Sequence, residues 1–187
     1  MADVSFGTAR MLTGKCLCGA VEYRVADRFE YAMNCHCSNC RRATGSAFKP
    51  FAGVKRGELS LVRGEGARLI YGDEGEAHDV HCASCGSLLY SVVREGAYAH
   101  VTLGTLVDAP AIRPSAHIFV GSKAEWFQIT DDLPQYECFP DDCGGAARSD
   151  DHDDLAELLV RLQEAMRLDD LIERKGPGDH RPERTVR

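Results

Sequence analysis

The sequence predicts a mainly β domain followed by a C-terminal helix. Three observations indicate this fold class: short stretches in which apolar and polar residues alternate, glycines that interrupt those stretches, and a change of character after Pro140. The chain has 187 residues, which suggests one domain of about 150 residues with an appendage. We expect the domain at 12–140, a linker and C-terminal helix at 141–175, and a disordered tail at 176–187.

The expected strands follow one another at short intervals. Residues 1–14 show no clear pattern and are expected to form a loose lead-in. Next, Val21, Tyr23 and Val25 alternate with two charged residues, which is typical of a half-buried strand. Similar alternation, or a short apolar run between glycines, indicates the others. We expect strands at 21–25, 59–62, 87–93, 98–106 and 117–120.

The pattern after the turn at 141–145 becomes helical. Residues 150–154 are mostly acidic, which suits the positive end of a helix dipole. Apolar side chains then recur at helical spacing: Leu155, Leu158, Leu159, Leu162 and Met166. We expect this helix to pack on the β domain, and the alternative is a homodimer formed through it.

The overall charge and hydropathy limit the partners. The net charge of −7 argues against nonspecific binding to nucleic acid. No apolar run approaches the ~20 residues that a membrane helix needs, and the first residues lack the features of a signal peptide. We therefore expect a cytoplasmic protein that binds neither nucleic acid nor membrane.

Cysteine is the most informative residue type in this chain. There are nine cysteines, and an odd number cannot all pair in disulfides. In a reducing compartment, clustered cysteines are more often metal ligands or reactive groups than disulfide partners. Seven of them form three clusters: Cys16 and Cys18; Cys35, Cys37 and Cys40; Cys82 and Cys85.

The three clusters predict a metal-binding protein. Two or three thiols within one turn reach a common ion at about 2.3 Å, the usual zinc–sulfur distance. We infer that the first and third clusters together supply the four ligands of a closed structural site. The middle cluster supplies three and leaves a fourth tetrahedral position open. Spacing alone also allows one multinuclear site for all seven thiols, and iron–sulfur ligation is another alternative.

An open site of three thiolates favours one kind of chemistry. Three thiolates around Zn²⁺ leave one net negative charge, and their electron donation makes the zinc a weaker Lewis acid than one held by neutral histidines. Hydrolysis by a zinc-bound hydroxide is therefore disfavoured. A thiol substrate suits the open position better, because sulfur ligands suit zinc.

The residues around these cysteines resemble the glutathione-dependent formaldehyde-activating enzyme family, which includes relatives of centromere protein V. The resemblance covers roughly residues 12–140. It is carried by GKCLCGAVEY at 14–23, CHCSNCRRATG at 35–45 and CASCGS at 82–87, and by later blocks at 108–110, 117–119, 123–126 and 132–134.

This resemblance implies a β-tent, a fold of antiparallel sheets held together by zinc, with two zinc ions per chain. It implies a structural zinc on Cys16, Cys18, Cys82 and Cys85 and a catalytic zinc on Cys35, Cys37 and Cys40. The family's founding activity joins glutathione to formaldehyde, which is a carbon–sulfur lyase reaction run in reverse. We therefore expect a carbon–sulfur lyase whose partners are a small thiol, with glutathione as the substrate, and a small aldehyde.

The sequence also suggests roles for two arginines and leaves two other classes of function open. Arg41 and Arg42 follow the open cluster, and one of them is expected to bind a carboxylate of glutathione. The alternative is that they support the cluster or face solvent. The domain could instead be a zinc-stabilised module that binds a partner protein without catalysis, or a zinc buffer.

Structural roles are expected for the other conspicuous side chains. Trp126 and Phe127 are expected to be core aromatics, and Cys138 and Cys143 to be thiols without a ligand. Four histidines are expected to make hydrogen bonds within the fold or at its surface rather than to bind metal: His36, His81, His100 and His117.

Overall fold

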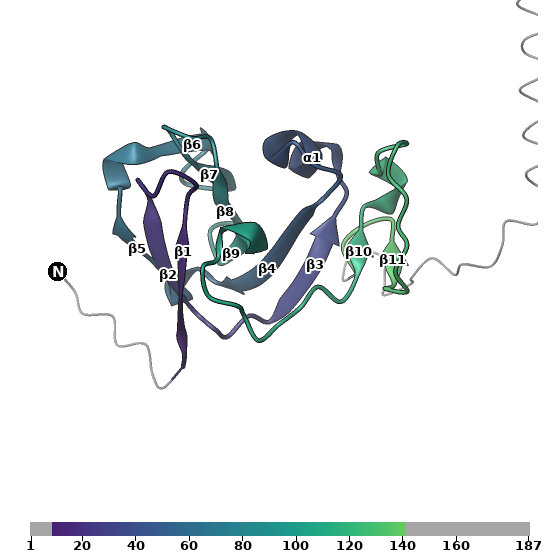
Figure 1. The fold of residues 1–187 in the computed structure, drawn as a ribbon, viewed down its shortest axis with the longest axis horizontal. Helices are drawn as coiled ribbons and strands as arrows, with labels where there is room; N and C mark the ends of the chain where they lie inside the picture. The colour runs from purple at the N-terminus through teal and green to yellow at the C-terminus, as the bar shows by residue number, and fades with distance from the viewer. Residues whose placement is uncertain (1–8, 141–187) are drawn as a thin grey trace, which may run out of the picture. The chain divides into compact units, whose positions relative to one another are not determined.

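The computed structural model describes residues 9–140, which form two β-sheets and a short α-helix (Figure 1). The mainly β prediction is confirmed. The expected linker, C-terminal helix and tail at 141–187, with Cys143, lie outside the described residues. Within residues 9–140, no helix has the length and apolar character needed to cross a membrane.

The smaller sheet has three antiparallel strands. Its strands are ordered β1-β2-β5 and span Met11–Lys15, Glu22–Ala26 and Leu59–Arg63. Strand β1 corrects the expected loose lead-in, because Met11–Lys15 pairs with β2 along its whole length. Gly14 lies opposite Tyr23, and a Cβ on Gly14 would fall 2.0 Å from Cζ of the Tyr23 ring. The ring therefore packs over the glycine and requires it.

The larger sheet has eight strands in the order β11-β10-β3-β4-β9-β8-β7-β6. In chain order they are β3 Tyr31–Cys35, β4 Lys49–Lys55, β6 Arg68–Gly72, β7 His78–Cys82, β8 Leu88–Val93, β9 Tyr98–Thr102, β10 His117–Ile118 and β11 Gln135–Tyr136. Helix α1, Ser38–Thr44, connects β3 to β4. Four 3-10 turns lie at Arg56–Glu58, Glu65–Ala67, Leu103–Thr105 and Val120–Ser122. The pairing is antiparallel except that β10 runs parallel to both β3 and β11, which corrects the expectation of purely antiparallel sheets.

The main hydrophobic core lies between the two sheets. The small sheet contributes Leu12, Tyr23 and Val25, and the large sheet contributes residues such as Val54 and Val101. All of these are buried. Because side chains alternate across a strand, this core uses one face of β4 and β9 and leaves the other face free for different residues.

A second, smaller core lies on that other face. It contains Met33, Cys35, Phe51 and Ile118. The register places Cys35 opposite Lys49 and Phe51 opposite Thr102, so these side chains share one face of the sheet. Figure 1 shows α1 above the β3–β4 pair, with β10 and β11 beyond β3. The middle cysteine cluster is therefore built at the end of this second face.

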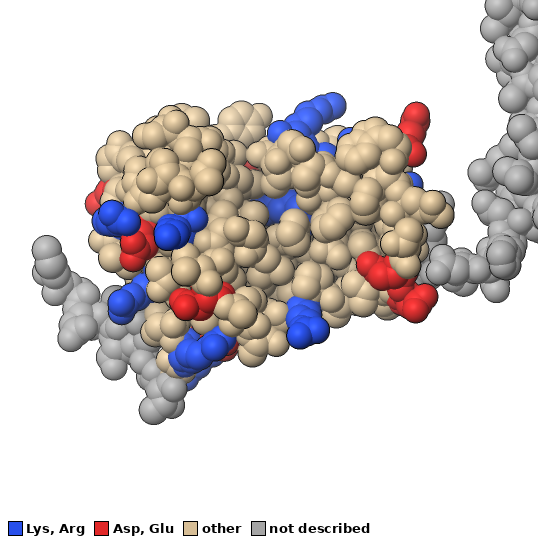
Figure 2. All heavy atoms as spheres, viewed as in Figure 1, with Lys and Arg blue, Asp and Glu red and all other residues tan. Residues whose placement is uncertain are grey.

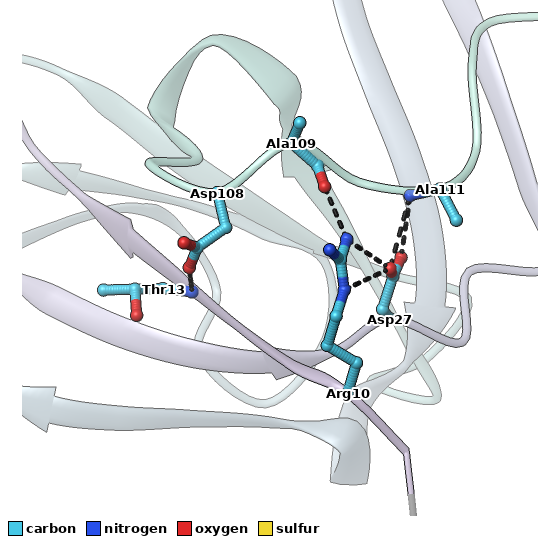
Figure 3. A network of polar contacts seen from close by, with 6 residues as sticks. All are labelled: Arg10, Thr13, Asp27, Asp108, Ala109 and Ala111. Atoms are coloured by element: carbon cyan, nitrogen blue, oxygen red, sulfur yellow. Dashed lines mark hydrogen bonds and ion pairs between the residues drawn. The ribbon is translucent and has the colours of Figure 1, made fainter.

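A polar network ties the N-terminal end of β1 to the segment after β9 (Figure 3). Arg10 donates from Nε and one terminal nitrogen to the Asp27 carboxylate, with distances of 3.1 and 2.7 Å. The same carboxylate accepts from the backbone of Ala111, and Asp108 accepts from the backbone of Thr13 at 2.7 Å. These contacts tie the start of β1 to the segment at 108–111.

Charged side chains are mixed on the exposed surface. On the face drawn in Figure 2, Lys and Arg are interspersed with Asp and Glu, and most of the area belongs to other residues. The charges of either sign are therefore not gathered into one patch on this face.

Candidate metal centre

Two similar turns bring the first and third cysteine clusters together. Cys16 follows β1 directly, and the Gly19 amide donates to the Cys16 carbonyl at 3.1 Å. Cys82 ends β7, and the Gly86 amide donates to the Cys82 carbonyl at 2.9 Å. Both glycines have positive φ, 74° and 73°, which a residue with a side chain adopts only at a cost. The glycines thus form the two turns that present the thiols.

The four sulfurs of this cluster have the spacing of metal ligands. The Sγ atoms of Cys16 and Cys18 lie 3.6 Å apart, and those of Cys18 and Cys82 lie 3.7 Å apart. With Cys85 included, all four lie within 4.8 Å of one another. A disulfide would need about 2.05 Å, whereas a tetrahedron with zinc–sulfur bonds of about 2.3 Å has edges of about 3.8 Å. The donor set therefore fits a tetrahedral metal ion.

The middle cluster is built where β3 passes into α1. Cys35 ends β3, Cys37 is the N-cap of α1, and Cys40 lies in its first turn. The three sulfurs lie within 4.8 Å of one another, and among the described residues no fourth Cys, His, Asp or Glu joins them. These three thiols could hold a metal ion with one position left for another ligand.

The three neighbouring thiols share their protons unequally. Hydrogen bonds from Cys35 and then Cys40 lower the pKa of Cys37 to about 2. Hydrogen bonds with Cys37 and then Cys40 raise the pKa of Cys35, which keeps its proton. The Cys37 sulfur also accepts from the backbone amide of Cys40 at 3.3 Å. The cluster therefore favours a thiolate, the form of cysteine that binds metals.

A chain of side chains runs from the backbone of this cluster to the surface. Nδ1 of His117 lies 2.8 Å from Nε2 of His36, and Nε2 of His117 lies 3.0 Å from an Asp131 oxygen. Because a carboxylate only accepts, His117 donates to Asp131 and accepts from His36. Burial and then His117 lower the pKa of His36 to about 4. His36 thus makes a hydrogen bond within the fold, as the sequence predicts, and His117 is a hydrogen-bonded sheet histidine.

The other two histidines are also hydrogen-bonded within the fold. Nε2 of His100 lies 2.9 Å from the Tyr31 hydroxyl, and its ring stacks on Phe51 with centroids 4.2 Å apart. Burial, followed by the charges of Lys49 and Arg94, lowers the pKa of His100 to about 3. His81 lies 3.2 Å from the Gly86 carbonyl.

The two arginines after the cluster have different surroundings. Nε of Arg41 donates to the His36 carbonyl at 3.2 Å, so Arg41 supports the backbone between two of the cysteines. Arg42 is exposed and lines a cleft of about 380 Å³ between α1 and the β6–β7 pair. The other lining residues are Asn39, Ala43, Tyr71, Asp79 and His81. This cleft adjoins the cluster through Asn39, which lies between Cys37 and Cys40 in sequence.

Lys49 is a functional candidate that sequence reasoning missed. It begins β4 opposite Cys35, it is only 3% exposed, and its Nζ donates to Ser91 Oγ at 2.5 Å. Its stretch, KPFAGVK, contains a proline and a glycine and gives no clear strand signal. The pairing with Cys35 connects it to the site, and that pairing depends on the register of the sheet.

Two expectations about other side chains need correction. Trp126 is 74% exposed and is therefore not a core residue, whereas its neighbour Phe127 packs against the rings of Phe48 and His36. Cys138 is disulfide-bonded rather than a thiol without a partner. Its role is therefore separate from both sulfur clusters.

Comparisons with known proteins identify the family of this chain. The family model described as glutathione-dependent formaldehyde-activating enzyme matches residues 11–122. A curated protein of Halomonas elongata named for the same family is 28% identical over 139 residues, which cover 69% of this chain and 87% of that protein. A solved structure of a Rhodobacter sphaeroides protein is 29% identical and covers 53% of this chain and 91% of that chain, with a TM-score of 0.45. Because the family model matches more than half of its residues, the chain belongs to the glutathione-dependent formaldehyde-activating enzyme family.

Proposed function

We propose that this chain is a carbon–sulfur lyase that joins the thiol of glutathione to formaldehyde at an open zinc site. The observation that carries the proposal is the different number of sulfurs in the two clusters, since one groups four and the other only three. A closed set of four suits a structural ion, and an open set of three suits an ion that meets a substrate. Family membership supports glutathione and formaldehyde as the reactants.

The proposed roles of the seven cysteines follow from this division. We assign one zinc to the four-sulfur cluster and one to the three-sulfur cluster, which makes two per chain. The ligands are Cys16, Cys18, Cys82 and Cys85 in the first and Cys35, Cys37 and Cys40 in the second. When bound at the open cluster, zinc supplies a fourth coordination position and favours the ionised form of a thiol.

The reaction needs little further chemistry from the protein. The thiolate sulfur attacks the carbonyl carbon, a carbon–sulfur bond forms, and the electron pair of the carbonyl π bond moves to oxygen, which takes up a proton. The chain's contribution is to hold the thiol and the aldehyde together in one orientation, which replaces a bimolecular encounter.

The cleft beside α1 is the proposed binding site for the charged ends of glutathione. Arg42 and Asp79 both line it, and among the described residues neither forms an ion pair. A guanidinium and a carboxylate facing one cleft suit a ligand that carries both a carboxylate and an ammonium group. The γ-glutamyl end of glutathione carries both groups. Arg42, rather than Arg41, is therefore the proposed glutathione contact.

The test combines metal analysis with an activity assay. Protein purified without chelators or added metal is expected to contain about two zincs per chain and to consume glutathione and formaldehyde together. Fully loaded protein that shows no saturable binding of glutathione would contradict the proposal and favour a zinc-stabilised protein-binding module. A cytoplasmic location and a homodimer through the C-terminal helix stay predictions from the sequence.

A further inference from the structure

A buried lysine lies at the open cysteine cluster. Lys49 is 3% exposed, and the one hydrogen bond of its Nζ is to the hydroxyl of Ser91. Among the described residues, no carboxylate lies within ion-pair distance of it. An ammonium group has three N–H donors, so a neutral hydroxyl leaves both its charge and two donors without a match. Burying an uncompensated charge is costly, and such groups are normally paired.

The three-cysteine cluster, which would carry one net negative charge around a divalent metal, begins on the adjacent strand. Lys49 pairs with Cys35 across β3 and β4, and paired residues project from the same face of a sheet. Further along that face is Thr102, which is 8% exposed and whose Oγ1 has no hydrogen-bond partner. The opposite face of the same strands is filled by the main apolar core. The polar groups of β4, β8 and β9 thus gather on the side where the three thiols lie.

We propose that Lys49 is the counter-charge of the three-cysteine site, so that its positive charge offsets the net negative charge of three thiolates around a divalent metal. This inference rests on the proposed function for the identity of the metal and the substrate. The two positive charges of Zn²⁺ and the three negative charges of the thiolates leave one negative charge, which one lysine balances. A substrate thiolate adds a second negative charge, and Lys49 lowers the electrostatic cost of that step as well.

Metal retention is the direct test, because it requires neither glutathione nor formaldehyde. The holoprotein is titrated with a zinc chelator, and the more readily removed zinc is assigned to the open cluster by its loss in Cys37→Ser. Lys49→Gln removes the charge and keeps a side chain able to bond Ser91. It is expected to weaken zinc retention at the open site by about 10- to 100-fold, as substitutions next to metal ligands do. Retention at the four-cysteine site is expected to stay unchanged.

Three further variants separate charge from structure. Lys49→Arg keeps the charge and is expected to retain zinc within a few-fold of wild type. Ser91→Ala removes only the hydrogen bond and is expected to behave likewise. Lys55→Met is the matched control, because Lys55 lies on the same strand but is exposed near Glu30. If Lys49→Gln does not fold, Lys49→Met, which fills the same space without a polar end, replaces it.

Two results would overturn the inference. One is zinc retention in the neutral Lys49 variants equal to that of Lys55→Met. The other is equal loss in Lys49→Arg and Lys49→Gln, which would indicate packing rather than charge. A protein without lyase activity but with this pattern of zinc retention would contradict the proposed function alone. If the protein is an active lyase but its zinc retention does not depend on the charge at position 49, only the role of Lys49 is contradicted.

Discussion

The Sγ atoms of Cys18 and Cys82 lie 3.7 Å apart although the two residues are separated by 64 positions in the chain. The first belongs to the turn after β1 of the small sheet, and the second ends β7 of the large sheet. A metal ion bound between them would therefore join the two sheets directly. Such a link makes the binding free energy of the ion part of the free energy of folding.

The first prediction concerns this link. Cys82→Ser is expected to give unfolded or insoluble protein, because structural zinc sites contribute about 10–16 kcal/mol of binding free energy that folding depends on. Soluble yield and thermal melting check it. Ser84→Ala, which alters an exposed residue of the same turn, is the control and should melt like wild type. Wild-type melting of Cys82→Ser would contradict a structural metal at this cluster.

The open cluster is expected to respond differently. Cys37→Ser should keep the fold, because Cys37 is the N-cap of α1 and serine is a preferred N-cap residue. We expect its zinc content to fall from about two to about one per chain, and saturable glutathione binding to be lost. Circular dichroism, metal analysis and calorimetric titration with glutathione provide the three measurements. Undiminished glutathione binding would separate the thiol site from this cluster.

The cleft beside α1 leads to a prediction about substrate affinity. Arg42→Glu is expected to raise the KM for glutathione about tenfold, the equivalent of one charge-assisted hydrogen bond of about 1.4 kcal/mol. The KM for a thiol without charged ends, such as mercaptoethanol, should change little. Arg24→Glu makes the same change of charge on an exposed residue of β2 and serves as the control. Equal effects on both thiols would remove Arg42 from the binding of the charged ends.

His100 predicts how stability depends on pH. Its pKa is about 3 in the folded chain, mainly because of burial, against about 6.5 when unfolded. Between these values only the unfolded chain binds the proton, so the stability contributed by neutral His100 is complete above about pH 6.5 and is lost as the pH falls towards 3. From pH 7 to pH 5 this loss amounts to about 2 kcal/mol.

The measurement compares the pH dependence of unfolding in wild type and His100→Asn. The cysteine clusters also lose metal in acid, but that loss is common to both proteins and cancels in the difference. The variant should start less stable at pH 7 and should lose less stability on acidification. If the unfolding free energies of the two proteins fell in parallel with pH, His100 would take up its proton equally in the folded and unfolded chain, against this prediction.

The sequence predicts β2, β5, β8, β9 and β10, where side chains alternate or form an apolar run, and misses β1, β3, β4, β6, β7 and β11. The strand around Val21–Val25 is found by its alternation, and β8 by its apolar run, whose residues Leu88–Val92 are buried as expected. Strand β4 is missed, because Pro50 and Gly53 break the pattern. Gly53 is there because a Cβ would lie 2.2 Å from Cζ of the Tyr31 ring. A cross-strand partner thus decides the residue, and local sequence does not contain that partner.

The sequence likewise predicts some parts of the candidate site and misses others. The spacing of the cysteines predicts the thiols within each turn, because ligands within one turn are necessarily near one another. The pairing of the first cluster with the third is an inference from the four ligands of a closed site, since spacing alone also allows one site for all seven thiols. The structure brings both predicted groups together. The contribution of Lys49 depends on its position opposite Cys35, and that of Asp79 on the place of β7 beside the cleft. Such contacts join strands distant in sequence, and no local pattern reports them.

The two faces of β4 and β9 pack against different parts of the protein. Ala52, Val54, Ala99 and Val101 face the main core, whereas Phe51 and His100 face the side of the open cluster. Substitutions at every second position of these strands can therefore alter the surroundings of the open cluster without opening a cavity in the core. A lineage that changed only those alternate residues would vary the surroundings of the three thiols while inheriting an unchanged architecture.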